Sequence, residues 1–325
     1  MTSRWTGFCS PLKAGIEMFL AHKRTLGYQV RTPESVLRLL DGFLVAQHVD
    51  TIEAITPPVM EAFLASRPRT SPHSFNQLLE IVGRLFDWLI ARDLVPRSPV
   101  QTKPRRTTAS RLPFLFDPPD ARRLLDAAGN LADTHNTAHR GLTYRMIFAL
   151  LYGLGLRVSE VARFRMGDVD LRHQLLIVRE TKFAKSRLVP FGPKMGKLLA
   201  GYLDRTPRVG ANSPIFTFRK CQPVSPCTIS TIFHELVPQL ALPIPDGTRP
   251  PCVHSLRHSF AVGTLLCWYR KGVDPGSRLL QLSTFMGHVN PSSTAVYLTI
   301  TTELLTEASR RFECWVEPLI HQVTP

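Results

Sequence analysis

Apolar residues recur with helical spacing through the first 95 residues. Leu12, Ile16, Phe19 and Leu20 form one stripe, and residues 32–48 and 71–95 show the same amphipathic pattern over longer runs. A shorter apolar segment lies around Val59 to Ala65. The pattern predicts a four-helix N-terminal domain over residues 1–95.

The pattern after residue 113 is mixed. "QLLIVRE" and "SRLVPF" are typical of two strands, and "TKFAKS" between them predicts the turn of a β-hairpin. Helices are expected at 118–128, 138–153, 158–165, 192–204 and 227–240, with further helices beginning near 254, 276, 291 and 301. The expected fold is mainly α with a small β-hairpin or sheet, and its second domain covers residues 113–325.

Residues 96–112, "PRSPVQTKPRRTTASRL", separate the two domains. This segment holds three prolines, five basic residues and no acidic residue. Such a composition predicts an extended, cationic linker, which could be a solvated tether or could follow a phosphate backbone.

Composition narrows the class of protein. The chain has 325 residues, of which 44% are hydrophobic and 20% charged, as in folded proteins, and its formal net charge is +15. A basic excess of this size favours a polyanionic partner. The longest apolar run, Met146 to Leu156, is too short to cross a bilayer, and Glu17 interrupts the only candidate signal segment. The six cysteines lack paired spacing, so we expect a reduced, cytoplasmic protein that is not bound to membranes.

Candidate chemistry begins at two basic segments. "LLYGLGLRVSEVARF" ends an apolar helix at two glycines and presents Arg157 at the start of the next helix, where backbone amides favour an anion. "HSLRHSFAVGTLL" places His254, Arg257 and His258 at helical positions i, i+3 and i+4, so that all three can face one way. The hairpin turn adds Lys182.

"GHVNPSSTAVYL" adds His288 and, nine positions later, Tyr297. Asn290 and Pro291 predict the start of a short helix that carries this tyrosine. Taken alone, a tyrosine here would be a half-buried core residue.

Two metal-site hypotheses have weaker support. His254 and His258 have the spacing of a helical zinc pair, with His288 as a third ligand, but no glutamate lies between them and Arg257 would place a cation beside the metal. Asp168 and Asp170 suggest two-metal chemistry, but turn capping before a strand explains them better. We expect neither a metal nor a cofactor.

The ordered motifs "GLRVSEVARF", "TKFAKSRLVPF", "HSLRHSFA", "MGH" and the following tyrosine resemble the tyrosine recombinase (phage integrase) family. The resemblance covers residues 113 to about 310. The preceding helices look like the family's core-binding (SAM-like) domain. The resemblance to this family implies an α+β catalytic domain that cleaves and rejoins double-stranded DNA through a phosphotyrosyl intermediate, without metal or ATP.

The resemblance also implies roles for single residues. Tyr297 would be the nucleophile, Arg157 and Arg257 would grip the non-bridging phosphate oxygens, and His288 would add a third donor. Lys182 would protonate the leaving 5′-oxygen, and His254 would act as base or phosphate donor. Glu160 would orient its cationic neighbours.

The sequence departs from the family at the hairpin. The family commonly has glycines beside its lysine, whereas Thr181 and Phe183 flank Lys182 here, so Lys185 stays an alternative acid. His258 is interpreted as a structural histidine beside Arg257. The apolar tail with Trp315, Leu319 and Ile320 either closes its own domain or packs on a neighbouring protomer.

The resulting hypothesis is a site-specific recombinase or integrase, with a mobile-element role favoured over a chromosomal one. It would act on DNA as a homotetramer or together with related recombinases. The alternatives are a DNA-relaxing enzyme of the type IB topoisomerase class and a non-catalytic DNA-binding regulator with the same fold.

Overall fold

A computed structural model describes residues 7–107, 111–135, 137–179, 186–206, 210–219, 222–288 and 290–299, with residues 306 and 309. The chain divides into two compact units, Met1–Ser110 and Arg111–Pro325. In the described ranges no helix is both long enough and apolar enough to pass through a membrane.

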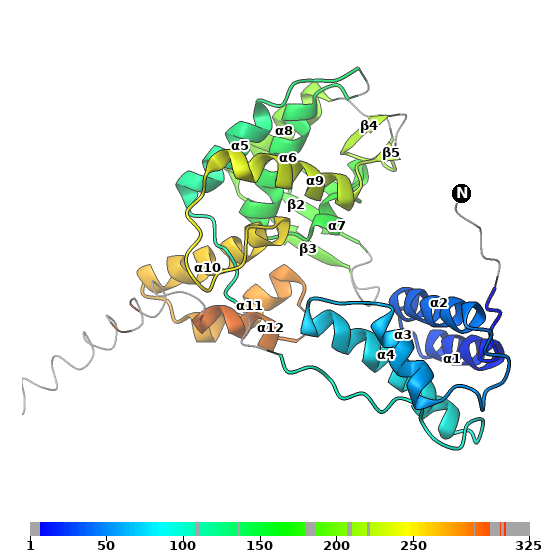
Figure 1. Ribbon diagram of the computed structural model, residues 1–325. Helices are drawn as coiled ribbons and strands as arrows, with labels where there is room; N and C mark the ends of the chain where they lie inside the picture. Colours follow the sequence, from blue (N-terminus) through cyan, green and yellow to red (C-terminus); the bar gives the residue numbers. More distant parts are fainter. Residues whose placement is uncertain are drawn as a thin grey trace, which may run out of the picture. The chain divides into compact units, whose positions relative to one another are not determined.

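The first unit is a four-helix domain, as predicted (Figure 1). The apolar stripe of the first helix is buried, with Ile16 fully covered and Leu12 and Leu20 each 1% exposed. Proline occupies the first turn of the last two helices, where its missing N–H costs no hydrogen bond. The helices are α1 (Lys13–Thr25), α2 (Arg31–Ala46), α3 (Pro57–Ala65) and α4 (Pro72–Ile90).

Arg105, in the segment that follows this domain, is fixed to it. Its guanidinium lies 3.9 Å from the centre of the Phe75 ring, and its backbone N–H donates to Asn76 Oδ1 at 2.7 Å. Its side chain also donates to the carbonyl of Arg69 at 2.7 Å. This part of the basic segment therefore packs along α4 and is not a free tether.

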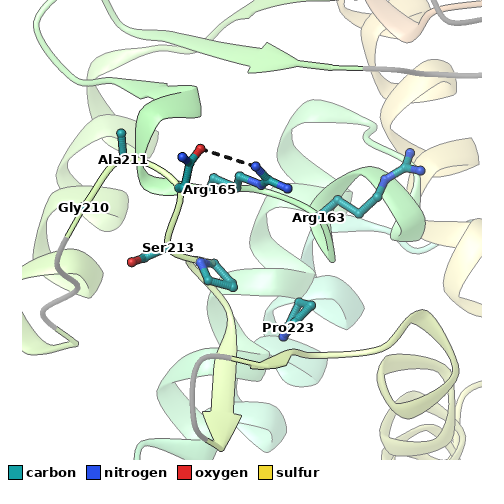
Figure 2. Close-up of a pocket in the computed structure, with 8 residues that line it drawn as sticks. Arg163, Arg165, Gly210, Ala211, Ser213 and Pro223 are labelled. Atoms are coloured by element: carbon teal, nitrogen blue, oxygen red, sulfur yellow. Dashed lines mark hydrogen bonds between the residues drawn. The ribbon is translucent and has the colours of Figure 1, made fainter.

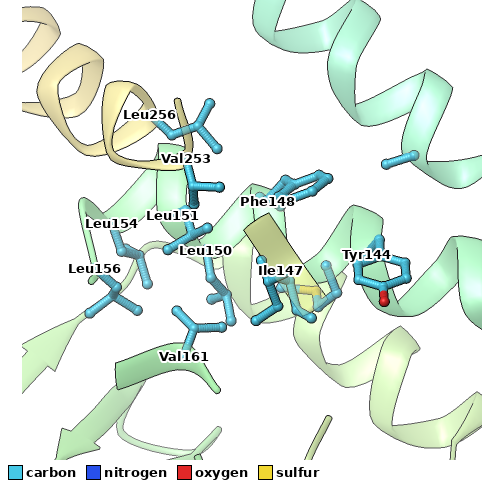
Figure 3. Packing of buried hydrophobic residues seen from close by; sticks show 14 of the residues in the cluster. Tyr144, Ile147, Phe148, Leu150, Leu151, Leu154, Leu156, Val161, Val253 and Leu256 are labelled. Atoms are coloured by element: carbon cyan, nitrogen blue, oxygen red, sulfur yellow. The ribbon is translucent and has the colours of Figure 1, made fainter. Parts of the chain in front are cut away.

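The second unit is built around α6 (Arg140–Leu154), which is buried on nearly all sides (Figure 3). Tyr144, Phe148 and Leu151 pack with Val253 and Leu256 in one continuous core. The other helices are α5 (Pro118–Gly129), α7 (Val158–Val161), α8 (Pro193–Arg205), α9 (Pro226–Leu236), α10 (Val253–Arg270), α11 (Pro275–Met286) and α12 (Ser292–Ala295). The described residues also include three 3₁₀ segments, η1 (Met166–Asp168), η2 (Val237–Leu240) and η3 (Val296–Thr299).

The predicted hairpin is present. β2 (Leu175–Val178) pairs antiparallel with β3 (Arg187–Pro190), so that Val178 lies opposite Arg187. A short strand that the sequence did not predict, β1 (Val169–Asp170), adds to the other edge of β2, and β4 (Thr217–Arg219) with β5 (Gln222–Pro223) forms a separate ribbon.

The helix expected over 158–165 was predicted too long. The chain becomes extended at Arg165, whose N–H donates to Asp168 Oδ2 at 2.9 Å. The carbonyl of Phe164 accepts from the N–H of Ile215 at 2.9 Å. These contacts outside the helix replace the i to i−4 pattern, so α7 ends after one turn.

The short helix expected from Asn290 is present. Asn290 Oδ1 accepts the N–H of Ser292 at 2.9 Å, in keeping with its predicted position at the helix start. One α-turn is followed by the 3₁₀ segment η3, which carries Tyr297. The tyrosine ring belongs to a small second core with Val262, Leu265 and Met286 of α10 and α11.

Candidate active site

Glu160 lies at the centre of an ion cluster formed by two arginines. Arg157 donates to it from its backbone N–H at 2.9 Å and from its side chain at 2.7 Å. Arg187 of β3 donates to both carboxylate oxygens, each at 2.9 Å. Burial alone would raise the pKa of Glu160, but the hydrogen bonds and charge of Arg187, with those of Arg157, lower it to about 2. Glu160 is therefore ionised and holds both arginines.

Arg187 was not predicted as a site residue. A signal for it exists in the sequence, because Arg187 and Val189 alternate along β3 and so share a face, and Val189 is fully buried. A basic residue on the inward face of a strand needs a buried partner.

The end of α11 supplies one carbonyl to each of three arginines. The carbonyl of Phe285 accepts from Nε of Arg187 at 2.8 Å, and that of Gly287 accepts from Arg157 at 2.7 Å. Between them, the carbonyl of Met286 accepts from Arg257 at 2.7 Å. Carbonyls at a helix C-terminus lack intrahelical partners and carry the negative end of the helix dipole, so they suit cations. Three arginines from separate elements thus bind the carbonyls of three consecutive residues.

Two glycines with left-handed backbone make this convergence possible. Gly155 ends α6 with φ +58°, and its carbonyl accepts from Arg257; an added Cβ would lie 2.3 Å from the ring of Phe260. Gly287 ends α11 with φ +71°, and a Cβ there would lie 2.7 Å from the guanidinium of Arg187. Both positions therefore require glycine for space as well as for φ.

Arg257 is 1% exposed, and loss of hydration, followed by the charge of Arg157, lowers its pKa to about 10. At neutral pH it is still a cation. Its Nε–H has no hydrogen-bond partner among the described residues. A buried guanidinium with a donor to spare is suited to an anionic ligand.

Tyr297 is 3% exposed, and its hydroxyl lies 2.8 Å from Nδ1 of His258. The ring of His288 lies nearly parallel to the tyrosine ring, with centroids 6.4 Å apart, and its Nδ1 is 2.7 Å from the hydroxyl of Thr294. Burial raises the pKa of Tyr297, while Arg257 and Arg157 oppose this increase. The interpretation of His258 as a structural residue beside Arg257 missed its contact with this hydroxyl.

The three histidines of the site are neutral at pH 7. Loss of hydration, followed by the charge of neighbouring cations, lowers the pKa of His258 and of His288 to about 4. The same causes lower the pKa of His254 to about 4, although this residue is exposed to solvent. His254 and His258 contact each other edge to face, with ring centroids 4.6 Å apart, so protonation of one opposes protonation of the other.

The structure places Arg157, Glu160, Arg257, His288 and Tyr297 around the ends of α6, α10 and α11, with His254 one turn before His258 on α10. Lys182 and its alternative Lys185 lie outside the described residues, as does the tail with Trp315, Leu319 and Ile320.

The two aspartates considered for metal chemistry cap turns, as the preferred interpretation predicted. Asp168 accepts the N–H of Arg165 and the side chain of Arg179. Asp170 accepts the N–H of His173 at 2.9 Å.

An open hollow lined by Arg163 and Arg165 lies beyond α7 (Figure 2). Arg165 donates to Asn212 at 3.3 Å, and Arg163 is exposed, three residues after Glu160. The chain from Gly210 to Pro214, with Pro223, forms the opposite side. This hollow contains none of the predicted site residues.

The chain matches the phage integrase family over residues 116–303. It is 33% identical to a putative integrase/recombinase, y4rB, of Sinorhizobium fredii, over 94% of this chain and 98% of the relative. It is 25% identical to the tyrosine recombinase XerC of Pediococcus pentosaceus, over 74% and 75% of the two chains. The chain therefore belongs to the phage integrase family. It is a tyrosine-type site-specific DNA recombinase, as the motifs predicted.

Solved structures share the fold at lower identity. A lambda integrase dimer bound to a core site matches with a TM-score of 0.63 at 16% identity, over 88% of this chain and 76% of that chain. The Tn1549 transposon integrase, in complex with a circular intermediate DNA, matches with a TM-score of 0.63 at 15% identity, over 92% and 99%. These likenesses confirm the mainly α fold with a small sheet.

Proposed function

We propose that Tyr297 attacks a phosphodiester of duplex DNA and forms a 3′-phosphotyrosyl bond with release of a 5′-hydroxyl. The covalent bond keeps the energy of the broken phosphodiester, so that rejoining needs no ATP. Support comes from the position of the phenol, which lies in contact with two histidines beside a cluster of arginines.

Arg157 and Arg257 bind the two non-bridging oxygens in this proposal. Planar guanidinium groups match phosphate geometry and keep their charge at all relevant pH values. The observation that carries the proposal is their attachment to the carbonyls of consecutive residues, Gly287 and Met286. Consecutive carbonyls lie within a few ångströms, about the span of one phosphate group.

His288 follows Gly287 directly and adds a third donor to the transition state. It is neutral in the free protein, and the negative charge of an approaching phosphodiester favours its protonation and that of His254. Lys182, from the hairpin between β2 and β3, protonates the leaving 5′-oxygen.

We further propose that the protein acts in the cytoplasm, for a mobile element, as a homotetramer that exchanges strands between two duplexes. The match to an integrase/recombinase along nearly the whole chain supports the mobile-element role, and so does the shared fold with a transposon integrase. The likeness to a lambda integrase tetramer bound to a Holliday junction, with a TM-score of 0.62 at 16% identity, supports the tetramer and the exchange of strands.

Covalent trapping tests this function. Purified protein is incubated with fragments of the DNA that flanks its own gene, and denatured samples are sequenced to map the positions joined to protein. We expect one defined site, 3′-linkage to Tyr297 by peptide mass spectrometry, and no adduct for Tyr297→Phe, which keeps the ring but removes the nucleophile.

Three outcomes would contradict the proposal. An adduct with the Tyr297→Phe variant would assign the nucleophile elsewhere. Relaxation of supercoiled plasmid without exchange between two sites would favour the topoisomerase alternative. Specific binding with no adduct, even on nicked DNA, would favour a regulator.

A further inference from the structure

The contact between His258 and Tyr297 has no role in the mechanism above. His258 and His288 lie against the ring of Tyr297, but among the described contacts only His258 has a ring nitrogen at hydrogen-bond distance from its oxygen, 2.8 Å. Nδ1 of His288 is instead engaged with Thr294, at 2.7 Å. The reacting oxygen therefore already has a partner in the DNA-free protein.

We propose that His258 is a further catalytic residue, which accepts the proton of Tyr297 during strand cleavage. This inference rests on the proposed role of Tyr297 as nucleophile. Nδ1 of His258 takes the hydroxyl proton as the phenol oxygen bonds to phosphorus and the bond from phosphorus to the 5′-oxygen breaks. The 5′-oxygen takes its proton from the general acid. In the reverse reaction His258 returns its proton to the departing phenol.

The surroundings of His258 suit this direction of transfer. The ring is half-buried and neutral, and with its proton on Nε2 it presents Nδ1 as an acceptor to Tyr297. The groups whose charge acts on it are His254 and Arg257 of α10, Arg249 before α10, and His288 after α11. All oppose an imidazolium in the free protein. The phosphate brings negative charge next to these cations, so the proton moves only when DNA is bound.

The positions of His254 and His258 on α10 give the two histidines different roles in this proposal. His254 and His258 are one turn apart and touch edge to face, so only one of them is readily protonated at a time. With His258 on the phenol, the solvent-exposed His254 is left for the phosphate. This assignment resolves the choice between base and phosphate donor that the sequence left open for His254.

The test uses a nicked duplex carrying the site mapped by covalent trapping, on which the adduct accumulates because the cut end is lost. We expect His258→Ala to bind this duplex as wild type does and to form adduct about 10²- to 10³-fold more slowly. His258→Asn keeps an acceptor near the Nδ1 position but cannot take a proton, so it should stay nearly as slow. His234→Ala on α9, whose ring bonds only within its own helix, is the matched control and should behave as wild type.

A second measurement separates proton acceptance from packing. Replacing Tyr297 by 3,5-difluorotyrosine gives a phenol that ionises more readily, so it should restore most of the lost rate in the His258→Ala background. A 5′-bridging phosphorothiolate duplex, which needs no acid for its leaving group, should not restore it.

The outcomes of these experiments distinguish a failure of the role of His258 from a failure of the role of Tyr297. Wild-type rates for His258→Ala, or full recovery in His258→Asn, would overturn the role as proton acceptor while leaving Tyr297 as nucleophile. A failure of difluorotyrosine to restore the rate would also overturn it. Adduct formation by Tyr297→Phe would instead refute the proposed function on which this inference rests.

Discussion

Arg187 and Glu160 form a two-point ion pair in which Nη1 of the arginine donates to Oε1 of the carboxylate and Nη2 donates to Oε2, each at 2.9 Å. The side chain of Glu160 is 1% exposed and that of Arg187 is 11% exposed, so water does not replace either partner. Since the same carboxylate binds Arg157, Arg187 of β3 helps to hold in place a residue that is proposed to contact the phosphate.

Arg187→Ala should be strongly destabilising because it leaves a buried carboxylate with one cation fewer. Breaking a buried pair costs about 3–5 kcal/mol in the free energy of unfolding, whereas Arg84→Ala, which removes the exposed pair with Glu80, should cost about 1 kcal/mol or less. Denaturant titration measures both. Arg187→Lys keeps the charge but not the two-point geometry, and we expect it to fold and to cleave DNA slowly. Equal stability of the Arg187 and Arg84 variants would contradict the cluster's role.

Gly287→Ala should impair cleavage more than folding. A left-handed alanine costs about 1–2 kcal/mol, and its Cβ at 2.7 Å from the guanidinium of Arg187 shifts the carbonyl that holds Arg157. Gly83→Ala, inside α4 with open space around it, should instead stabilise the protein by about 0.5–1 kcal/mol. Thermal unfolding and adduct formation are measured on both, and normal cleavage by Gly287→Ala would refute this dependence.

The stability of the free protein should decrease as the pH falls below about 6.5. The pKa of His258 and of His288 is about 4 in the folded state, and about 6.5 in an unfolded chain. Between these values the unfolded chain binds more protons, so the free energy of unfolding is lost progressively from pH 6.5 to pH 4. Glu160, with its pKa lowered to about 2, adds a loss in the same direction below about pH 4.5.

Denaturant titrations at pH 7.5, 6 and 5 measure this slope. A double variant, His258→Asn with His288→Asn, should show a flatter profile over the same range because it lacks both titrating rings. A wild-type profile that is level or rises toward pH 5 would contradict the assignment of neutral histidines.

Cleavage should proceed in EDTA. In the proposed mechanism the positive charge at the phosphate comes from Arg157 and Arg257, and neither side chain depends on a divalent cation. Adduct yield on nicked DNA is compared with and without chelator. Loss of the adduct in EDTA with recovery on adding magnesium would refute a cation-independent mechanism.

Lys182→Ala should be slow on ordinary DNA and largely restored on a 5′-bridging phosphorothiolate. An alkoxide is a poor leaving group because hydroxyls of this type have pKa values of order 15, whereas a thiol with a pKa near ~8.5 leaves without an acid. Arg157→Ala should gain much less, since its charge acts on oxygens that the sulfur does not replace. If sulfur restores Lys185→Ala and Lys182→Ala cleaves normally, Lys185 is the acid.

The sequence predicted most elements of both units, and the structure brings together those candidate site residues that lie in its described ranges, Lys182 being outside them. Helical periodicity and paired strands depend on local patterns, and Arg257 and His254 share a helix face for the same reason. The position of Arg187 in the ion cluster and the contact between His258 and Tyr297 were missed because they depend on residues far apart in the chain. The length of α7 was wrong because contacts with residues 213–215 override its helical pattern.

The backbone carbonyls of residues 285–287, which accept hydrogen bonds from three arginines, make the site tolerant of sequence change. Phe285 and Met286 hold Arg187 and Arg257 through backbone oxygens, which every amino acid carries, so their side chains are free to vary with the core around them. Only Gly287 is restricted, through its φ and the nearby guanidinium. Substitutions at positions 285 and 286 would therefore change packing and stability first. The backbone carbonyls would still hold the arginines in place.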